Sequence, residues 1–228
     1  MNWSGGKDSS LCLYEIFQEK KYDVKYLLTS VNQAAQRISM HGVRTALLYA
    51  QAEAIGIPLR LLELPEEISM SEYDKKMSAV IASLRKEEIG HSIFGDIFLE
   101  DLRKYREEKL LPHDMKGVFP LWKKPAPELM RQFLALGFKA MVVCASEDKL
   151  GKSYCGKIIT EEWVNSLPPE TDVCGENGEY HSFVFDGPIF KKPIAFEVGE
   201  TVYREYKAPQ GAPQNIGFYF TDLLPVSS

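Results

Sequence analysis

The residues best suited to chemistry form one short run near the start of the chain, which we term the anion loop: Ser4, Gly5, Gly6, Lys7, Asp8 and Ser9. Its two glycines let backbone N–H groups approach an oxyanion, and a helix that starts here adds unpaired donors and a positive dipole end. Its hydroxyl groups and the ammonium of Lys7 add further donors. Asp8 would repel a phosphate, so we expect it to bind Mg²⁺ or to cap the helix. The run predicts phosphate binding.

The anion loop has two alternative interpretations. A glycine turn with a Ser or Asp cap is common at the start of a helix, but the complete run at a strand-to-helix junction favours a phosphate site. The spacing also differs from that of a Walker A loop. The segment 151–153 imitates the end of that motif, but Ser146 stands where the motif requires glycine. Phosphate binding is therefore assigned to the anion loop.

A second run, residues 172–183, is termed the polar turn. Its centre combines two carboxylates, an amide, a phenol and an imidazole around glycines, in the order Gly175, Glu176, Asn177, Gly178, Glu179, Tyr180 and His181. Several polar groups could converge on a substrate from one tight loop of this kind. The simpler alternative is a polar β-turn that leads into a strand.

The two runs, in this order and about 170 residues apart, resemble the signatures of the diphthine–ammonia ligase family, also called the ATP-binding domain 4 family. This family is part of the PP-loop or N-type ATP pyrophosphatases of the adenine-nucleotide α-hydrolase superfamily. The resemblance implies an ATP-dependent ligase that adenylates a carboxylate and releases pyrophosphate. Ammonia then displaces AMP and forms an amide. In the family, the carboxylate is that of diphthine on translation elongation factor 2.

The resemblance implies roles for particular residues on the nucleotide side. The anion loop would hold the pyrophosphate, with Lys7 as a catalytic residue and Mg²⁺ beside Asp8. Ser30 and Val31, at the end of a strand, are placed as the usual adenine contacts of this fold. His41 and Arg44 open the second helix, where the guanidinium could pair with phosphate. The implied cofactors are ATP and Mg²⁺.

The polar turn would face the acceptor, and five of its members are expected to bind the substrate: Glu176, Asn177, Gly178, Glu179 and Tyr180. Glu179 or His181 is the candidate general base, because ammonia must attack in its neutral form. Asp96 lies at the end of a predicted strand, where it would hold magnesium, line the acceptor cleft or only cap a helix. The expected partners are ATP, ammonia and a carboxylate, such as one carried by an elongation factor.

Hydrophobic periodicity predicts an α/β fold, a doubly wound parallel sheet over residues 1–146 and a smaller mixed α+β domain over residues 147–228. Alternating elements are expected in the first part, with helices at 9–20, 41–55, 71–88 and 128–136 and strands at 24–31, 57–64, 91–97 and 139–145. Glycine and proline interrupt the second part, where short strands are expected at 182–185, 201–206 and 217–221.

Two features depart from the family. Only Met1–Trp3 precede the anion loop, so either the central strand is unusually short or residues are missing upstream. The region 95–122 is closer to bacterial relatives than to archaeal and eukaryotic ligases. Bacteria are not expected to make diphthamide, so a bacterial source would imply a PP-loop enzyme that acts on a different carboxylate.

Composition restricts the expected partners and the cellular compartment of the protein. A net charge of −5 gives no general attraction to nucleic acid or to an anionic membrane. Four cysteines without a Cys-x-x-Cys pair, together with the absence of a long apolar run, favour the cytoplasm. A homodimer stays open. Two other classes also remain: a nucleotide-binding protein without turnover, in the manner of universal stress proteins, and an interaction protein that has lost catalysis.

Overall fold

The computed structural model describes residues 1–38, 41–206 and 215–226. The helices of this part are α1 Lys7–Glu19, α2 Thr45–Ile55, α3 Met70–Lys86, α4 Glu100–Leu110, η1 Leu111–His113, α5 Ala126–Ala135, η2 Lys152–Tyr154 and α6 Glu161–Asn165. The strands are β1 Leu27–Asn32, β2 Arg37–Ile38, β3 Leu59–Leu64, β4 His91–Ile93, β5 Lys116–Val118, β6 Lys139–Ser146, β7 Tyr180–Asp186, β8 Phe196–Tyr206 and β9 Ile216–Pro225. None of these helices has the length and apolar character needed to cross a membrane.

The first layer is a parallel sheet held together by the three residues that precede the anion loop. β1 pairs in parallel with β3, and β4 pairs in parallel with β5. Between these pairs, the N–H of Asn2 donates to the carbonyl of Ile93 at 2.9 Å and that of Trp3 donates to Leu28 at 2.8 Å. The segment 1–3 therefore acts as the central strand, and the predicted α/β fold with a parallel sheet is confirmed.

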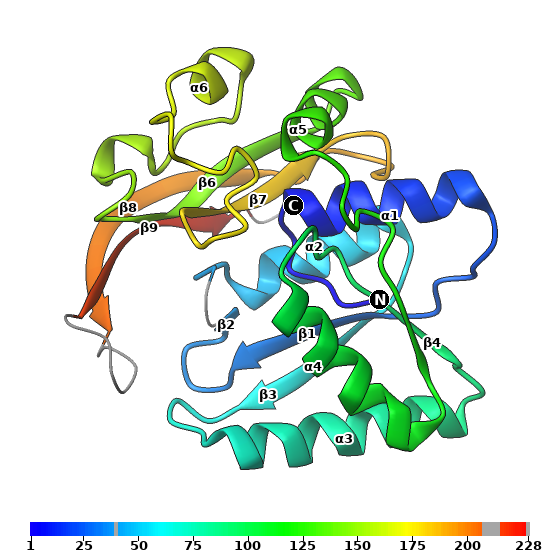
Figure 1. The fold of residues 1–228 in the computed structure, drawn as a ribbon. Helices are drawn as coiled ribbons and strands as arrows, with labels where there is room; N and C mark the ends of the chain where they lie inside the picture. Colours follow the sequence, from blue (N-terminus) through cyan, green and yellow to red (C-terminus); the bar gives the residue numbers. More distant parts are fainter. Residues whose placement is uncertain (39–40, 207–214, 227–228) are drawn as a thin grey trace.

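Helices cover both faces of this sheet, with α1 and α2 on one side and α3 and α4 on the other (Figure 1). The α1–α2 side joins the main hydrophobic core, to which Trp3, Leu27 and Val31 contribute. The α3–α4 side has a separate and much smaller core of four buried residues: Ile81, Phe94, Leu110 and Met115. α4 and β5 were not predicted, and β4 ends four residues earlier than the strand expected at 91–97.

The second layer is an antiparallel sheet in the order β7-β6-β9-β8. The strand predicted at 139–145 was expected to continue the parallel sheet, and this was wrong: β6 pairs antiparallel with both β7 and β9. All but the first residue of β6 are buried, and such a run has the same pattern in either kind of sheet. The division at residue 146 stays a prediction; β6 lies before it and its partner strands lie after it.

An ionic clamp ties β9 to the beginning of α2. The carboxylate of Asp222 accepts hydrogen bonds from Arg37 at 2.8 and 2.9 Å and from Arg44 at 3.0 and 2.6 Å. Partial burial opposes ionisation of this carboxyl, but the two guanidinium groups hold the pKa of Asp222 well below its usual range. The clamp thus links the two sheets through paired charges.

We expect Asp222→Asn to lower the free energy of unfolding by about 1 to 2 kcal/mol at neutral pH, because the clamp is only partly buried. The pKa of Asp222 is depressed in the folded state. Its contribution is therefore complete above the unfolded-state pKa of about 4 and is lost as the pH falls below that value. Urea unfolding of the parent and of Asp222→Asn between about pH 3 and pH 7 measures this effect. The difference in the free energy of unfolding should shrink as the pH falls.

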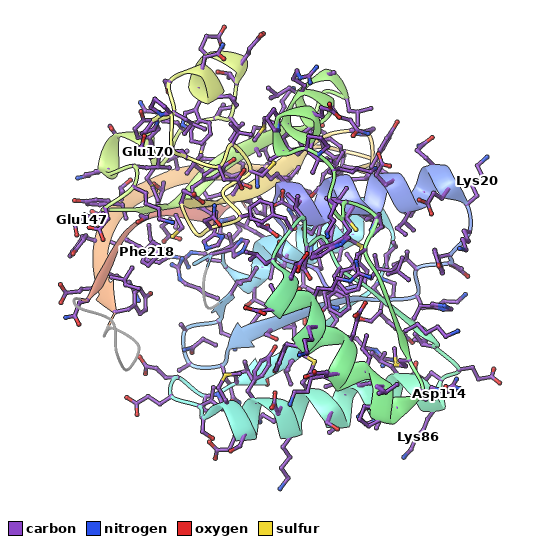
Figure 2. All side chains as sticks on the ribbon, in the orientation of Figure 1. Lys20, Lys86, Asp114, Glu147, Glu170 and Phe218 are labelled. Carbon is purple, nitrogen blue, oxygen red and sulfur yellow. The ribbon has the colours of Figure 1, made fainter. Side chains whose placement is uncertain are left out.

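Asp114→Asn is the matched control. Asp114 pairs with Arg85 but is 87% exposed, and it lies at the surface near Lys86 (Figure 2). Its replacement should change stability by less than about 0.5 kcal/mol. Equal effects of the two substitutions, or a loss for Asp222→Asn that does not depend on pH, would contradict the clamp.

Candidate active site

The anion loop folds back on the start of α1 through its hydroxyl groups. The hydroxyl of Ser4 lies 3.1 Å from that of Ser9 and accepts a hydrogen bond from the N–H of Gly6. The hydroxyl of Ser9 donates to the carbonyl of Gly6 at 2.9 Å. Gly6 is the N-cap of α1 and offers no side chain to cap it. Hydroxyl groups and the N-terminus of a long helix therefore meet at one point, an arrangement suited to an anion.

Gly5 is held in place by a glutamine, Gln51, that was not predicted as a site residue. Its φ of +72° favours glycine, and a Cβ here would lie 2.7 Å from Oε1 of Gln51. The fully buried amide of Gln51 accepts from the indole N–H of Trp3 and donates to the carbonyls of Gly5 and Val184. Gln51 thus connects α2, the loop and β7.

Main-chain contacts join the anion loop to β7. The N–H of Val184 donates to the carbonyl of Gly5 at 2.9 Å, and the N–H of Lys7 donates to the hydroxyl of Ser182 at 3.1 Å. Gly6 is packed so closely that a Cβ would lie 3.0 Å from the carbonyl oxygen of Ser182. The two runs recognised in the sequence are therefore brought together, and Ser182 is a site residue that was not predicted.

The ammonium of Lys7 lies in the seam between the loop and the polar turn. It binds both carboxylate oxygens of Asp8, at 2.9 and 2.7 Å, and also the carbonyl of Cys174. It lies 5.1 Å from the ring centroid of Tyr180. Burial opposes its charge, but the carboxylate of Asp8 raises the pKa of Lys7 above its ordinary value. Phosphate binding by Lys7 and magnesium binding by Asp8 stay predictions, since here the two residues pair with each other.

The polar turn is organised by two carboxylates. Asp172 accepts from the N–H groups of Cys174 and Glu176, at 3.3 and 2.8 Å. Glu179, only 3% exposed, accepts from the N–H of Asp172 at 3.3 Å and lies 3.4 Å from the amide nitrogen of Asn177. Glu179 therefore lies inside the turn, and its predicted catalytic and substrate-binding roles stay predictions. Asp172 was part of the recognised run but was not assigned to the site.

Tyr180 is also buried, and its packing explains the first glycine of the turn. Its hydroxyl donates to the carbonyl of Val173 at 2.7 Å. Gly175 has a φ of +68°, and a Cβ there would lie 2.8 Å from the Tyr180 ring. Gly178 also has a positive φ, of +81°, but no atom lies within 4 Å of its Cβ position. Only Gly175 is required by both backbone and packing.

Glu176 is the carboxyl group whose chemistry stands out. Its Oε1 accepts from the N–H of Ile97 at 2.8 Å, four residues beyond the carboxyl end of β4. Burial, reinforced by the negative charges of Asp8 and Asp96, outweighs this hydrogen bond and raises the pKa of Glu176 to about 7. Asp96 itself is nearly buried and pairs with Arg106 at 2.6 Å. A carboxyl that titrates near neutrality can exchange a proton under working conditions.

Two histidines from distant parts of the chain stack beside the loop. The rings of His41 and His181 are 4.3 Å apart between centroids. A Cβ on Gly6 would lie 3.4 Å from Cε1 of His41. Burial, together with the nearby charge of Lys7, lowers the pKa of His181 to about 4, and burial also depresses that of His41. Both rings are neutral at pH 7, and His181 is a weak base.

The other residues predicted to contact the nucleotide or magnesium lie apart from the contacts between the anion loop and the polar turn. Ser30 and Val31 do lie near the carboxyl end of β1; Val31 is fully buried, and Ser30 is partly exposed. Arg44 is held by Asp222. Within the described ranges, no group of three or more His, Cys, Asp or Glu side chains is arranged to hold a metal ion. The magnesium site stays a prediction.

Two family models match this chain, and each includes one of the two runs. The family model of the diphthamide synthase N-terminal domain matches residues 1–111, which include the anion loop, and that of the C-terminal domain matches residues 125–211, which include the polar turn. The chain belongs to this family. The mouse diphthine–ammonia ligase is 26% identical over 220 residues, which cover 87% of this chain and 82% of the mouse protein.

Other diphthine–ammonia ligases match over a shorter length. The zebrafish protein is 25% identical over 66% of this chain and 65% of its own length, and the human protein is 25% identical over 66% of this chain and 62% of its own length. The chain therefore spans less than two thirds of these two relatives. Membership in the diphthamide synthase family confirms the predicted enzyme class, a ligase.

A pair of substitutions in the polar turn separates backbone strain from packing. Gly178→Ala should lower the free energy of unfolding by about 1 to 2 kcal/mol, which is the penalty of a left-handed conformation alone. Gly175→Ala should lower the free energy of unfolding by about 2 to 5 kcal/mol, because the added methyl group also overlaps the Tyr180 ring. Urea unfolding of both variants measures the difference. Equal losses would show that the contact between Gly175 and Tyr180 does not constrain the turn.

Proposed function

We propose that this protein is an ATP-dependent, AMP-forming ligase of the diphthine–ammonia ligase type. In the first step, a carboxylate oxygen attacks the α-phosphorus of ATP, and pyrophosphate leaves. In the second step, ammonia attacks the acyl adenylate, AMP leaves, and one proton is released as the amide forms. The hydrogen bonding of the anion loop with β7 carries this proposal, because it brings the loop and the polar turn into one site.

On this proposal, the anion loop holds the pyrophosphate moiety of ATP through its hydroxyl groups and the start of α1. The end of β1, at Ser30 and Val31, borders the adenine, as ligands of open α/β sheets bind outside the carboxyl ends of the strands. Mg²⁺ in nucleotide enzymes is usually held by one or two carboxylates and by substrate phosphates. The carboxylate of Asp8 belongs to the loop and fits that role if the ammonium of Lys7 moves from Asp8 to the phosphate.

Glu176 is the best placed general base for the attack of ammonia. A base must be ionised at the working pH yet retain affinity for a proton, and a pKa of about 7 meets both needs. His181 is a weaker base, and Glu179 is engaged inside the turn. This reassigns the base from the residues that the sequence suggested to their neighbour in the same run.

The acceptor is proposed by analogy with the relatives' names: the carboxylate of diphthine on a protein such as an elongation factor. A different carboxylate would suit a bacterial source. Ammonia and ATP are the other partners, the cytoplasm is the expected location, and a homodimer stays open. A non-catalytic nucleotide-binding protein is the alternative, and the titrating carboxyl group beside the loop favours the enzyme.

The direct test mixes the protein with ATP, Mg²⁺, ammonium and a carboxylate library that includes diphthine-modified elongation factor. We expect AMP and pyrophosphate in equal amounts, measured by chromatography and by a pyrophosphate assay. Ser9→Ala should weaken ATP binding about tenfold by removing one loop hydroxyl. Ser10→Ala is the matched control, since Ser10 is fully buried one residue further into α1. Release of ADP and phosphate would refute the proposed cleavage.

The pH profile tests Glu176. The base must be deprotonated, so the rate of amide formation should rise with pH through about 7. Glu176→Gln should lower that rate by a factor of about 100 or more and remove the rise. Hydroxylamine replaces ammonia because it is largely neutral at pH 7, and rates are expressed per concentration of the neutral nucleophile so that its own titration does not contribute. Glu170→Gln, on the surface (Figure 2), is the control. A parental profile in Glu176→Gln would rule out this base.

A further inference from the structure

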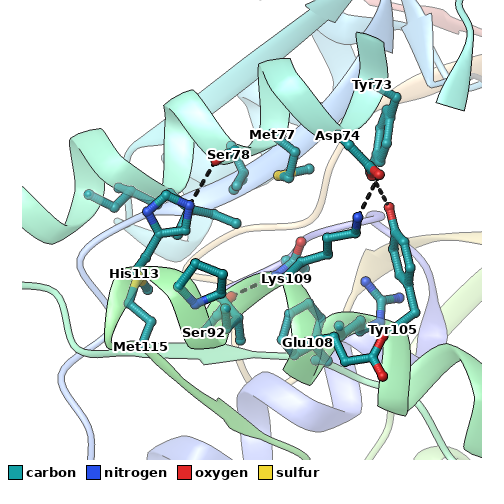
Figure 3. A pocket seen from close by; sticks show the side chains of 18 of the residues that line it. Tyr73, Asp74, Met77, Ser78, Ser92, Tyr105, Glu108, Lys109, His113 and Met115 are labelled. Carbon is teal, nitrogen blue, oxygen red and sulfur yellow. Dashed lines mark hydrogen bonds and ion pairs between the residues drawn. The ribbon is translucent and has the colours of Figure 1, made fainter. Parts of the chain in front are cut away.

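A cavity of about 410 Å³ lies on the opposite face of the parallel sheet from α1 and α2. It is an open pocket lined by α3, α4, η1 and the sheet, and Figure 3 shows most of the side chains that line it. Much of the wall is apolar, with Met77 and Ile81 from α3, Phe94 after β4, and Leu110 and Met115 around η1. Apolar walls, a volume of several hundred Å³ and a few polar groups are the usual features of a small-molecule site.

Several polar groups of the wall are hydrogen-bonded to one another. Asp74 accepts a hydrogen bond from the hydroxyl of Tyr105 and another, at 2.6 Å, from the ammonium of Lys109. These three side chains point toward one another at one end of the cavity (Figure 3). Further along α3, the hydroxyl of Ser78 lies 2.8 Å from Nε2 of His113. One end of the cavity can therefore orient a polar group on a ligand.

The charges of the wall that are not exposed are already paired. Asp74 pairs with Lys109, and Arg106 pairs with Asp96 on the side of the candidate active site. The two other charged residues of the wall, Lys75 and Glu108, are exposed. A charged ligand inside the cavity would leave water without gaining an uncommitted counter-ion there, since the unpaired Lys75 is exposed to solvent, and this is costly at a largely apolar site. The electrostatics therefore favour an uncharged occupant.

We propose that this cavity binds a small, uncharged, largely apolar molecule that presents one hydrogen-bonding group to Asp74, Tyr105 and Lys109. Its size suits a bicyclic ring system, because a dry cavity of about 150 Å³ already accepts one benzene ring. The site lies across the sheet from the anion loop, and Arg106 is the residue through which it borders Asp96. Binding here requires neither ATP nor turnover, so it is independent of the proposed function.

Three probes with one apolar body but different charge test the proposal: indole, indole-3-acetate and tryptamine. Isothermal titration calorimetry of the full chain without ATP should show one indole site, with the acid and the amine at least tenfold weaker. Tighter or equal binding of either charged probe would overturn the assignment of an uncharged ligand. Absence of indole binding up to its solubility limit would overturn the site itself.

Variants on α3 and α4 locate the binding. Met77→Trp fills the cavity and should abolish indole binding, whereas Ala79→Trp, exposed on the same helix, should retain it. Tyr105→Phe leaves the shape nearly unchanged and should weaken indole severalfold without affecting the fold. Circular dichroism and thermal unfolding check that each variant is folded. Parental affinity in both Met77→Trp and Tyr105→Phe would place the indole elsewhere and overturn the proposal.

Discussion

The structure depends on main-chain hydrogen bonding between the anion loop and the edge strand β7. The carbonyl of Gly5 accepts from Val184 and from the amide of Gln51, so one oxygen connects the loop, α2 and the second sheet. A net hydrogen bond contributes about 1 kcal/mol, but leaving such a buried carbonyl without partners costs about 1 to 3 kcal/mol. The cost of leaving the carbonyl unpaired, which is larger than the gain from pairing it, therefore keeps the loop against β7. The loop in turn covers the edge of that strand.

The cations around the site are already paired. Lys7 binds Asp8, Arg44 shares Asp222 with Arg37, and Arg106 holds Asp96. What the loop offers to an anion is therefore a set of neutral donors, namely hydroxyl groups and the start of a helix. A highly charged ligand would draw Lys7 or Arg44 away from its carboxylate. Binding of such a ligand would then be coupled to the contacts that connect the two sheets.

The sequence was informative where chemistry is local. Glycines, hydroxyl groups and a helix start within six residues identified the loop, and a dense run of polar groups around Gly175 identified the turn. The sequence also predicted β1, α2, β3 and α3 because their apolar residues recur with a regular period. It missed α4, in which only Leu110 is buried, so no apolar stripe marked that helix.

Long-range partners were beyond such reasoning. Nothing near Arg44 indicates that Asp222 would bind it across 178 positions, and a buried run such as β6 does not reveal the direction of its neighbours. Gln51 looked like one more polar residue of a helix, although it is fully buried. Likewise, the acidity of Glu176 depends on burial and on Asp8 and Asp96, which come from other elements.

The contact between Lys7 and Ser182 spans 175 positions in the sequence, and this separation has a kinetic consequence. Contacts between residues so far apart must close a very long loop of chain, and they form late in folding. During synthesis, the anion loop emerges before β7 and at first lacks the strand that completes it. The loop therefore reaches the conformation described here only when β7 docks, so a segment that is made early is among the last to be completed.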